Sequence, residues 1–232
     1  MSSFVRRVSG VVARFLDGPP PVEAERASEI DEAWRAALER RPKMFDGRIL
    51  LADRVALEGD TLEVDFREAG FSTLMWLRGA GASEARLFNV FGAAAVISRD
   101  GAALLGRMAP HTANAGQIYF PCGTPDLGDV CGETVDLEGS IARELAEETG
   151  LAAPVVRSTE KAIAIFDGRL VGFIRRFETD LDAGELEARA LAHLAAEREP
   201  ELDRIVMARS AAELGDASPR YVELALGALL GD

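Results

Sequence analysis

The chain has 232 residues, of which 48% are hydrophobic and 28% are charged, and its formal net charge is −13. These values are typical of a globular protein with one large domain, or of a domain with a substantial extension. No apolar run approaches the roughly 18 residues that a membrane helix needs. The strong negative charge disfavours nucleic acid and anionic membranes as partners, so we expect neither.

The N-terminus and the cysteines bear on the compartment. Arg14 interrupts the apolar part of the first 18 residues and no small-residue cleavage site follows, so we expect no signal peptide. Cys122 and Cys131 are nine residues apart, which is not the spacing of zinc ligands. We interpret them as free thiols in a reducing environment, which favours a cytoplasmic protein.

The first part of the chain predicts a linker, a helix and a strand pair. Residues 18–28 are rich in proline and charge and are interpreted as a rigid, solvated linker. Ser28 is a suitable N-cap for a helix that Pro42 ends. Apolar and charged residues alternate from Leu62 to Phe66, which predicts a half-buried strand. The Glu-Gly-Asp segment before it predicts a turn from an earlier strand.

The second part of the chain predicts hairpins and helices. Residues 90–108 read as two strands joined by a turn, followed by a flexible loop. Residues 121–139 are rich in Gly, Asp and Pro and are interpreted as loop. Further elements are expected in this order: a strand at 117–120, a helix at 140–149, a hairpin at 160–178, a helix at 185–198, a strand at 204–208 and a helix at 219–230. Hairpins without regular strand–helix alternation favour an α+β fold, or a mixed β-sheet between helices.

The expected helix at 140–149 carries an unusual acidic face in the segment "IARELAEETGL". Glu144, Glu147 and Glu148 are spaced i, i+3 and i+4, so they share one face and repel one another. Ile141 and Leu145 form a separate apolar stripe that can pack on a sheet. A solvated acidic surface is one interpretation. The other is a site for a hard divalent cation, which takes oxygen ligands and offsets the repulsion.

The phrase "RELAEETGL" supports the second interpretation, because it resembles the second half of the Nudix box, G-x5-E-x7-R-E-U-x-E-E-x-G-U with U aliphatic. All seven specified positions are filled: Arg143, Glu144, Leu145, Glu147, Glu148, Gly150 and Leu151. The preceding "FPCG" is similar to the strand end that enters this box. The resemblance implies a Nudix-like α/β/α sandwich at residues 86–232, with residues 1–85 as an N-terminal extension packed on that core.

The first half of the box departs from the pattern. At strict spacing its glycine and glutamate would fall on Asp129 and Val135, which do not fit. We interpret this as a loop insertion, because loop length changes cost little. The role of Glu133 is therefore open, with Asp129 and Asp136 as alternatives.

The resemblance also implies an activity: Mg²⁺-dependent, or Mn²⁺-dependent, hydrolysis of the pyrophosphate bond in a nucleoside diphosphate linked to another moiety. It implies metal ligation by Glu144, Glu147 and Glu148, with a contribution from the Gly123 carbonyl. Glu147 and Glu148 would also be catalytic. Arg143 is expected to orient a glutamate by an ion pair and not to touch the substrate.

Other residues are candidates by position. Glu201, with Glu199 as an alternative, precedes the strand at 204–208 and is the expected general base. The expected substrate contacts are Arg107, His111 and Arg175, with Arg176 as the alternative to Arg175. His193 is interpreted as structural.

The substrate class is left open, with a nucleotide-sugar-like compound slightly favoured. Two alternatives to the enzyme also stay open: a Nudix-fold sensor that binds a nucleotide ligand without turnover, and a structural acidic helix in another α+β protein. Homodimer formation is open as well.

Overall fold

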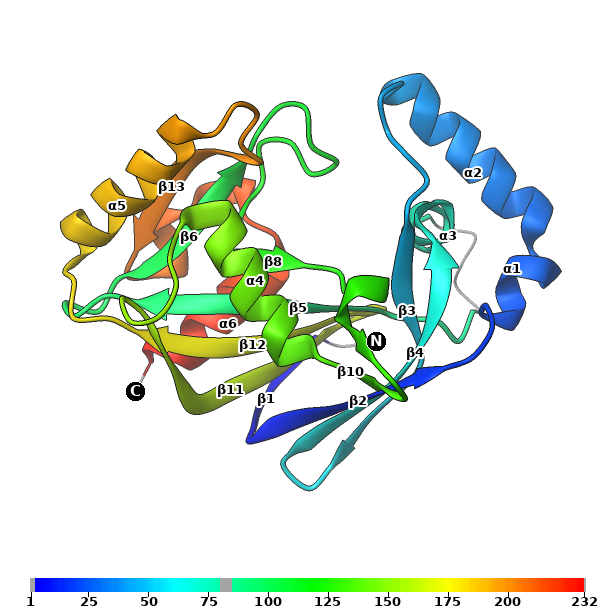
Figure 1. The fold of residues 1–232 in the computed structure, drawn as a ribbon, viewed down its shortest axis with the longest axis horizontal. Helices are drawn as coiled ribbons and strands as arrows, with labels where there is room; N and C mark the ends of the chain where they lie inside the picture. Colours follow the sequence, from blue (N-terminus) through cyan, green and yellow to red (C-terminus); the bar gives the residue numbers. More distant parts are fainter. Residues whose placement is uncertain (1–2, 80–84, 232) are drawn as a thin grey trace. The chain divides into compact units, whose positions relative to one another are not determined.

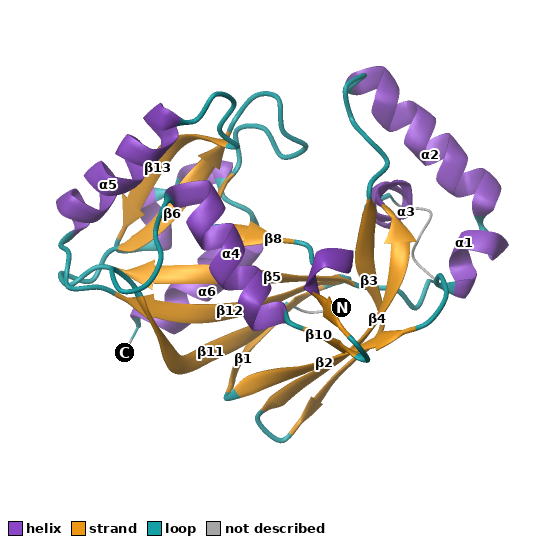
Figure 2. Cartoon of the chain, in the orientation of Figure 1, coloured by secondary structure: helices purple, strands orange, loops and turns teal. Residues whose placement is uncertain are grey.

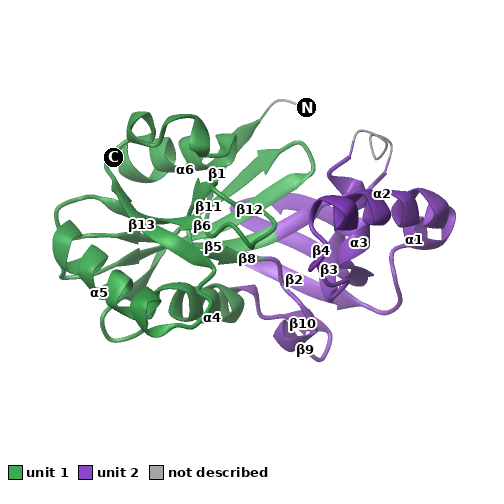
Figure 3. Ribbon diagram, turned by 90° about the horizontal axis from the view of Figure 1, so that it is seen from above, with its two compact units in different colours: residues 1–10, 91–123, 138–232 green, residues 11–90, 124–137 purple. Residues whose placement is uncertain are grey.

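The computed structural model describes residues 3–79 and 85–231. The chain forms two compact units, and each of them draws on separate stretches of sequence (Figure 3). Unit 1 contains Met1–Gly10, Phe91–Gly123 and Glu138–Asp232, and unit 2 contains Val11–Val90 and Thr124–Leu137. This division differs from the expected boundary between residues 85 and 86, because a short N-terminal stretch joins unit 1 and the inserted segment joins unit 2.

Unit 1 is built on one sheet, with the strand order β1-β11-β12-β5-β6-β13 and two short strands at its margin (Figure 1). Its strands are β1 (Phe4–Val8), β5 (Asn89–Ile97), β6 (Ala103–Met108), β7 (Ile118–Tyr119), β8 (Cys122–Gly123), β11 (Arg157–Asp167), β12 (Leu170–Glu178) and β13 (Leu202–Ala208). The central strand β5 is buried along its whole length, which explains its run of small and β-branched residues. The β5–β6 and β11–β12 hairpins confirm the predicted ones.

Three helices cover this sheet: α4 (Leu137–Thr149), α5 (Ala183–Ala196) and α6 (Arg220–Leu230). In Figure 3, α4 and α6 lie on opposite faces of the sheet. Helix α5 packs along β13 and α6 packs on β11. Unit 1 is thus a sheet between helices, and the mixture of helices and strands in Figure 2 confirms the predicted α+β class.

Strand β1 was not predicted. It pairs antiparallel with β11, and the Phe4 and Phe166 rings stack with centroids 4.6 Å apart. Its partner lies more than 150 residues further along the chain, so no local pattern reveals the pairing.

Unit 2 contains a five-stranded sheet in the order β3-β4-β2-β10-β9. Its strands are β2 (Gly10–Leu16), β3 (Arg48–Glu58), β4 (Thr61–Gly70), β9 (Val130–Cys131) and β10 (Thr134–Val135). The β3–β4 hairpin confirms the predicted strand pair. Its turn contains Gly59 at φ +64°, a conformation that favours glycine.

Unit 2 has the helices α1 (Pro21–Glu25), α2 (Ala27–Arg40) and α3 (Phe71–Leu77). They correct three expectations. The expected linker at 18–28 contains α1, because a proline in the first helical turn has a preset φ and needs no N–H partner. Helix α2 begins before Ser28, which therefore does not cap it. Helix α3 was not predicted, and Glu23 of α1 holds its start by accepting hydrogen bonds from the Gly70 amide (2.8 Å) and the Thr73 hydroxyl (2.7 Å).

The segment at 121–139, expected to be loop, also contains structure. It includes β8, a short 3-10 helix η2 (Leu127–Asp129) and the β9–β10 hairpin. Gly132 at φ +66° allows the two-residue turn, and Thr134 of β10 pairs with Arg14 of β2. The insertion therefore extends the sheet of unit 2. No helix among the described residues is long and apolar enough to cross a bilayer.

Candidate functional site

Helix α4 is held by its apolar stripe and by its ends. Ile141 and Leu145 are each 1% exposed. The helix starts at Leu137, earlier than predicted, and ends where predicted, since Gly150 adopts φ +68°. His193 of α5 lies against this end, with its Nε2 atom 2.8 Å from the Glu147 carbonyl oxygen. This contact fits the interpretation of His193 as a structural residue.

Arg143 neutralises part of the acidic face. Its guanidinium donates to Glu144 (2.7 Å) and Glu147 (3.3 Å), and it also contacts Ser140. One arginine thus serves two of the three carboxylates of this acidic face. The expected orienting ion pair is present.

Glu148 is the carboxylate that this arrangement leaves out. It is 7% exposed, and its Oε2 atom has no hydrogen-bond partner among the residues that the structure describes. The Cys122 backbone amide donates a hydrogen bond to the carboxylate. Burial raises the pKa of Glu148 well above its ordinary value, and the charges of Glu144 and Glu201 raise it further.

Glu144 lies against β8. A Cβ atom added to Gly123 would lie 2.5 Å from the Glu144 side-chain Cδ, so only glycine leaves room for this carboxylate. Burial raises the pKa of Glu144, while the charge of Arg143 opposes the shift. The Gly123 backbone and the Glu144 side chain are therefore in direct contact.

Glu201 enters the same group from another part of the chain. It directly precedes β13, where its carbonyl accepts a hydrogen bond from the Ala109 amide (2.8 Å). Its charge raises the pKa of both Glu144 and Glu148. The fold thus brings Gly123, Glu144, Glu148 and Glu201 together, while Glu147 is more exposed, at 61% of its side chain.

Tyr221 of α6 is a neighbour that the sequence did not indicate. It is 6% exposed, hydrogen-bonds to the Cys122 thiol and packs edge-on against Phe91 at 5.1 Å between centroids. Burial raises the pKa of both the thiol and the phenol, so both stay protonated. No local signal connects residues so far apart in sequence.

Arg107 and Arg175 are committed to carboxylates. Arg107 of β6 makes a bidentate pair with Asp203 of β13, at 2.6 and 3.1 Å. Arg175 of β12 is 6% exposed, pairs with Glu138 of α4 and donates to the Thr159 carbonyl at 3.2 Å. In these contacts neither guanidinium pairs with Glu144, Glu147 or Glu148. Arg175 instead ties the first turn of α4 to the sheet.

The remaining candidates lie in varied settings. His111 is exposed in the loop between β6 and β7, and Glu199 is exposed before β13. Arg176 donates to the Leu229 carbonyl at 3.1 Å. Glu133 is exposed in the turn of the β9–β10 hairpin and belongs to unit 2. Asp129 is buried and accepts a hydrogen bond from the Asp126 amide, so its carboxylate caps η2.

The fit of a divalent cation follows from the donor set. Within residues 3–79 and 85–231, no three His, Cys, Asp or Glu side chains converge as a ready-made metal site. The donors nevertheless suit a hard cation, since they are carboxylate and carbonyl oxygens. The unpartnered Glu148 oxygen is a buried acceptor that such an ion would satisfy.

Neither a protein-family model nor a curated protein matches the chain. Solved structures resemble part of it. RenU, a Nudix hydrolase from M. smegmatis, is 14% identical and aligns over 60% of this chain and 81% of its own, with a TM-score of 0.40. An Ap4A hydrolase from C. elegans is 11% identical over 61% of this chain and 96% of its own, with a TM-score of 0.43.

A third structure covers more of this chain. A bifunctional NMN adenylyltransferase/ADP ribose pyrophosphatase from Francisella tularensis, solved with AMP and a Mn ion, is 15% identical. It aligns over 91% of this chain and 49% of its own, with a TM-score of 0.41. Likenesses at such identities and TM-scores do not assign a function to this chain.

Proposed function

We propose that this chain is a Nudix-type hydrolase that uses a divalent cation to cleave the pyrophosphate bond of a nucleoside diphosphate linked to another moiety. The products would be a nucleoside monophosphate and the phosphate of that moiety. The two free thiols, Cys122 and Cys131, agree with the reducing cytoplasm that we propose as its location.

The proposal rests on Glu148, which is buried and has a carboxylate oxygen without a hydrogen-bond partner in the described part of the chain. A buried carboxylate with an unpartnered oxygen, beside two further carboxylates, is unfavourable without a positive charge. Arg143 does not supply that charge, since it contacts Glu144 and Glu147. A structural acidic helix would instead turn its carboxylates to water.

Glu144, Glu147, Glu148 and the Gly123 carbonyl would hold the cation, Mg²⁺ by proposal and Mn²⁺ as the alternative. When bound, such an ion neutralises charge on phosphate oxygens and acidifies a bound water. Arg143 keeps Glu144 and Glu147 in place by its ion pairs. Arg175 supports the same face indirectly, because its pair with Glu138 fixes the start of α4.

Glu201 is the proposed general base. Its charge acts on Glu144 and Glu148, and it comes from a loop end that can approach a substrate. It would accept the proton of the attacking water, with Glu147 and Glu148 as the alternative acceptors. Arg107 and His111 are the proposed substrate contacts, and Arg107 would have to exchange Asp203 for a phosphate.

The test is turnover of a panel of nucleoside diphosphate derivatives, nucleotide sugars included, with Mg²⁺ or Mn²⁺. Released monophosphate is measured in ¹⁸O-labelled water, which marks the attacked phosphorus. The key variant is Glu148→Gln, and its matched control is Glu223→Gln, the same change on the exposed side of α6. We expect turnover by the control and by the native chain, and its loss in Glu148→Gln.

The same panel separates the alternatives. Saturable binding of a nucleotide without any product would replace the enzyme by a sensor. If the chain neither binds a nucleotide nor gains thermal stability with metal, the acidic helix is only structural and the proposal is wrong.

A further inference from the structure

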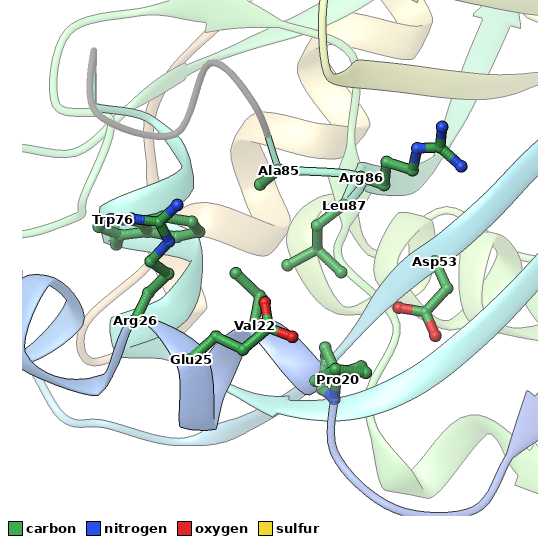
Figure 4. Close-up of a pocket in the computed structure, with 10 residues that line it drawn as sticks. Pro20, Val22, Glu25, Arg26, Asp53, Trp76, Ala85, Arg86 and Leu87 are labelled. Atoms are coloured by element: carbon green, nitrogen blue, oxygen red, sulfur yellow. The ribbon is translucent and has the colours of Figure 1, made fainter.

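Unit 2 contains a cavity of its own, with a volume of about 470 Å³, formed by α1, β3, α3 and residues 85–87 (Figure 4). Small-molecule sites in proteins span roughly 300 to 1,000 Å³. All of its lining residues belong to unit 2.

The body of the cavity is apolar. Trp76 and Leu87 belong to the apolar cluster of unit 2, and Val22 packs against that cluster. Pro20 and Pro21 form another part of the lining and have no backbone N–H. These walls favour an apolar group and give an anion no amide donors at that end.

Two of the charged side chains at the cavity are already neutralised. Arg26 pairs with Glu29 at 2.9 Å, and Asp53 pairs with Arg67. Glu29 also accepts a hydrogen bond from the Trp76 indole at 3.3 Å, which fixes the arginine end of the cavity. These four groups therefore contribute little net charge to a ligand.

The other two charged side chains, Glu25 and Arg86, point in different directions. Neither Glu25 nor Arg86 has an ion pair or hydrogen bond with any residue in the described part of the chain. In Figure 4 the Glu25 carboxylate lies beside Val22, toward the cavity, whereas the Arg86 side chain extends away from it. The uncompensated charge that faces the cavity is thus negative.

We propose that this cavity binds a small organic cation, an amine whose ammonium group is attached to an alkyl or aryl body. The ammonium group pairs with Glu25, and the apolar body packs on Val22 and Leu87 beside the Trp76 ring. The net charge of −13 adds a general attraction for cations. This binding is separate from the proposed hydrolysis, and neither depends on the other.

The test uses 2-phenylethylamine as the probe and 3-phenylpropionate as its anionic counterpart. The chain has two tryptophans, so Trp34→Phe leaves Trp76 as the only indole reporter. Phenylalanine preserves the edge-to-face contact of position 34 with Phe71. We expect a saturable change in Trp76 fluorescence with the amine and none with the carboxylate.

Glu25→Gln is the decisive variant in this background, and Glu32→Gln is its control. Both remove one negative charge from an unpaired glutamate, but Glu32 is exposed on α2 and does not line the cavity. Loss of the ion pair should weaken amine binding about tenfold in Glu25→Gln and leave the control near the native value. Thermal unfolding confirms that both variants fold.

Three results would overturn the inference. They are no saturable response to the amine, equal binding of the carboxylate, and equal affinities of Glu25→Gln and Glu32→Gln. Each is read from binding and not from turnover, so failure here leaves the hydrolase proposal untouched.

Discussion

The acidic face of α4 and the charged surface of β2, β3 and β4 both bring carboxylates close together, but they differ in how far arginines offset the repulsion. On the strands, Glu63 and Asp65 are each within 3.7 Å of both Arg14 and Arg54. Hydrogen bonds from Arg54 and Arg14 lower the pKa of Glu63. On the helix, one arginine serves two of three glutamates, and burial raises the pKa of the third, Glu148.

This difference in arginine pairing indicates which carboxylates of an acidic chain are candidates for a functional site. Carboxylates that are paired with arginines of the same chain need no ligand to balance their charge. Glu144 and Glu148 are largely buried and only Glu144 has an arginine partner, which fits the proposed cation.

The largest expected effect is on turnover. Glu148→Gln should lower kcat at least about 100-fold, because it removes a proposed metal ligand. Glu63→Gln should leave kcat within about twofold, since an ion pair on a sheet surface has no part in the reaction. Steady-state kinetics on any accepted substrate provides the comparison. Equal losses in the two variants would remove the functional distinction between the two regions.

The next effect is on stability, through the half-buried ion pair of Arg175 and Glu138 that anchors α4. Arg175→Met should lower the free energy of unfolding by about 2 kcal/mol, since it leaves Glu138 and the Thr159 carbonyl without their buried donor. Arg54→Met, in the exposed network, should have a much smaller effect. Urea denaturation of both variants measures the difference. A larger loss for Arg54→Met would contradict the assignment of Arg175 as the anchor.

The contributions of Glu148 and Glu63 to the free energy of unfolding should change in opposite directions with pH. A carboxyl group whose pKa is raised by folding stabilises the native state below its unfolded pKa of about 4.3, and this contribution is lost as pH rises through the folded pKa. Without metal, Glu148 should therefore destabilise the chain as pH increases through that window. Glu63, whose pKa is lowered, contributes stability that is lost as the pH falls.

Thermal unfolding against pH, with EDTA present, measures this effect. Glu148→Gln should flatten the loss of stability at rising pH, whereas Glu63→Gln should not. Added Mg²⁺ should stabilise the native chain more at high pH than at low pH, because the ligands must be deprotonated. A metal effect that is independent of pH would argue against Glu148 as a ligand.

The smallest expected effect comes from Tyr221→Phe. Removing the hydroxyl takes away the hydrogen bond to the Cys122 thiol and should lower stability by about 1 kcal/mol. Because Cys122 holds Glu148 through its amide, the apparent affinity for Mn²⁺ should also fall a few-fold. Tyr119→Phe removes a hydroxyl bonded to Asn114 (3.1 Å) and should leave Mn²⁺ affinity unchanged. Equal Mn²⁺ affinities in the two variants would limit Tyr221 to packing.

Local patterns predicted much of unit 1 and the centre of the site. The i, i+3, i+4 spacing placed the three glutamates on one face, and Gly150 marked the end of α4. The alternating strands and their glycine turns gave the three main hairpins. These features depend on neighbours in sequence, which is why sequence alone revealed them.

The missed features depend on distant contacts or on cooperation between weak signals. Strand β1 needs β11 as its partner, and Tyr221 meets Cys122 only because α6 packs under the sheet. The prolines before α1 suggested a linker, although proline also starts helices. The inserted hairpin of β9 and β10 has two residues in each strand and gains its stability from β2, so its own sequence resembles a loop.

The pairing of β1 with β11 sets an order of events during synthesis. All of unit 2 has left the ribosome once residue 137 is out, whereas β1 must wait for residues 157–167. At typical translation speeds, this nascent N-terminal strand stays without its partner for on the order of ten seconds. The residues of unit 1 that are synthesised first, Phe4 among them, therefore reach their partners only after most of the chain has been made.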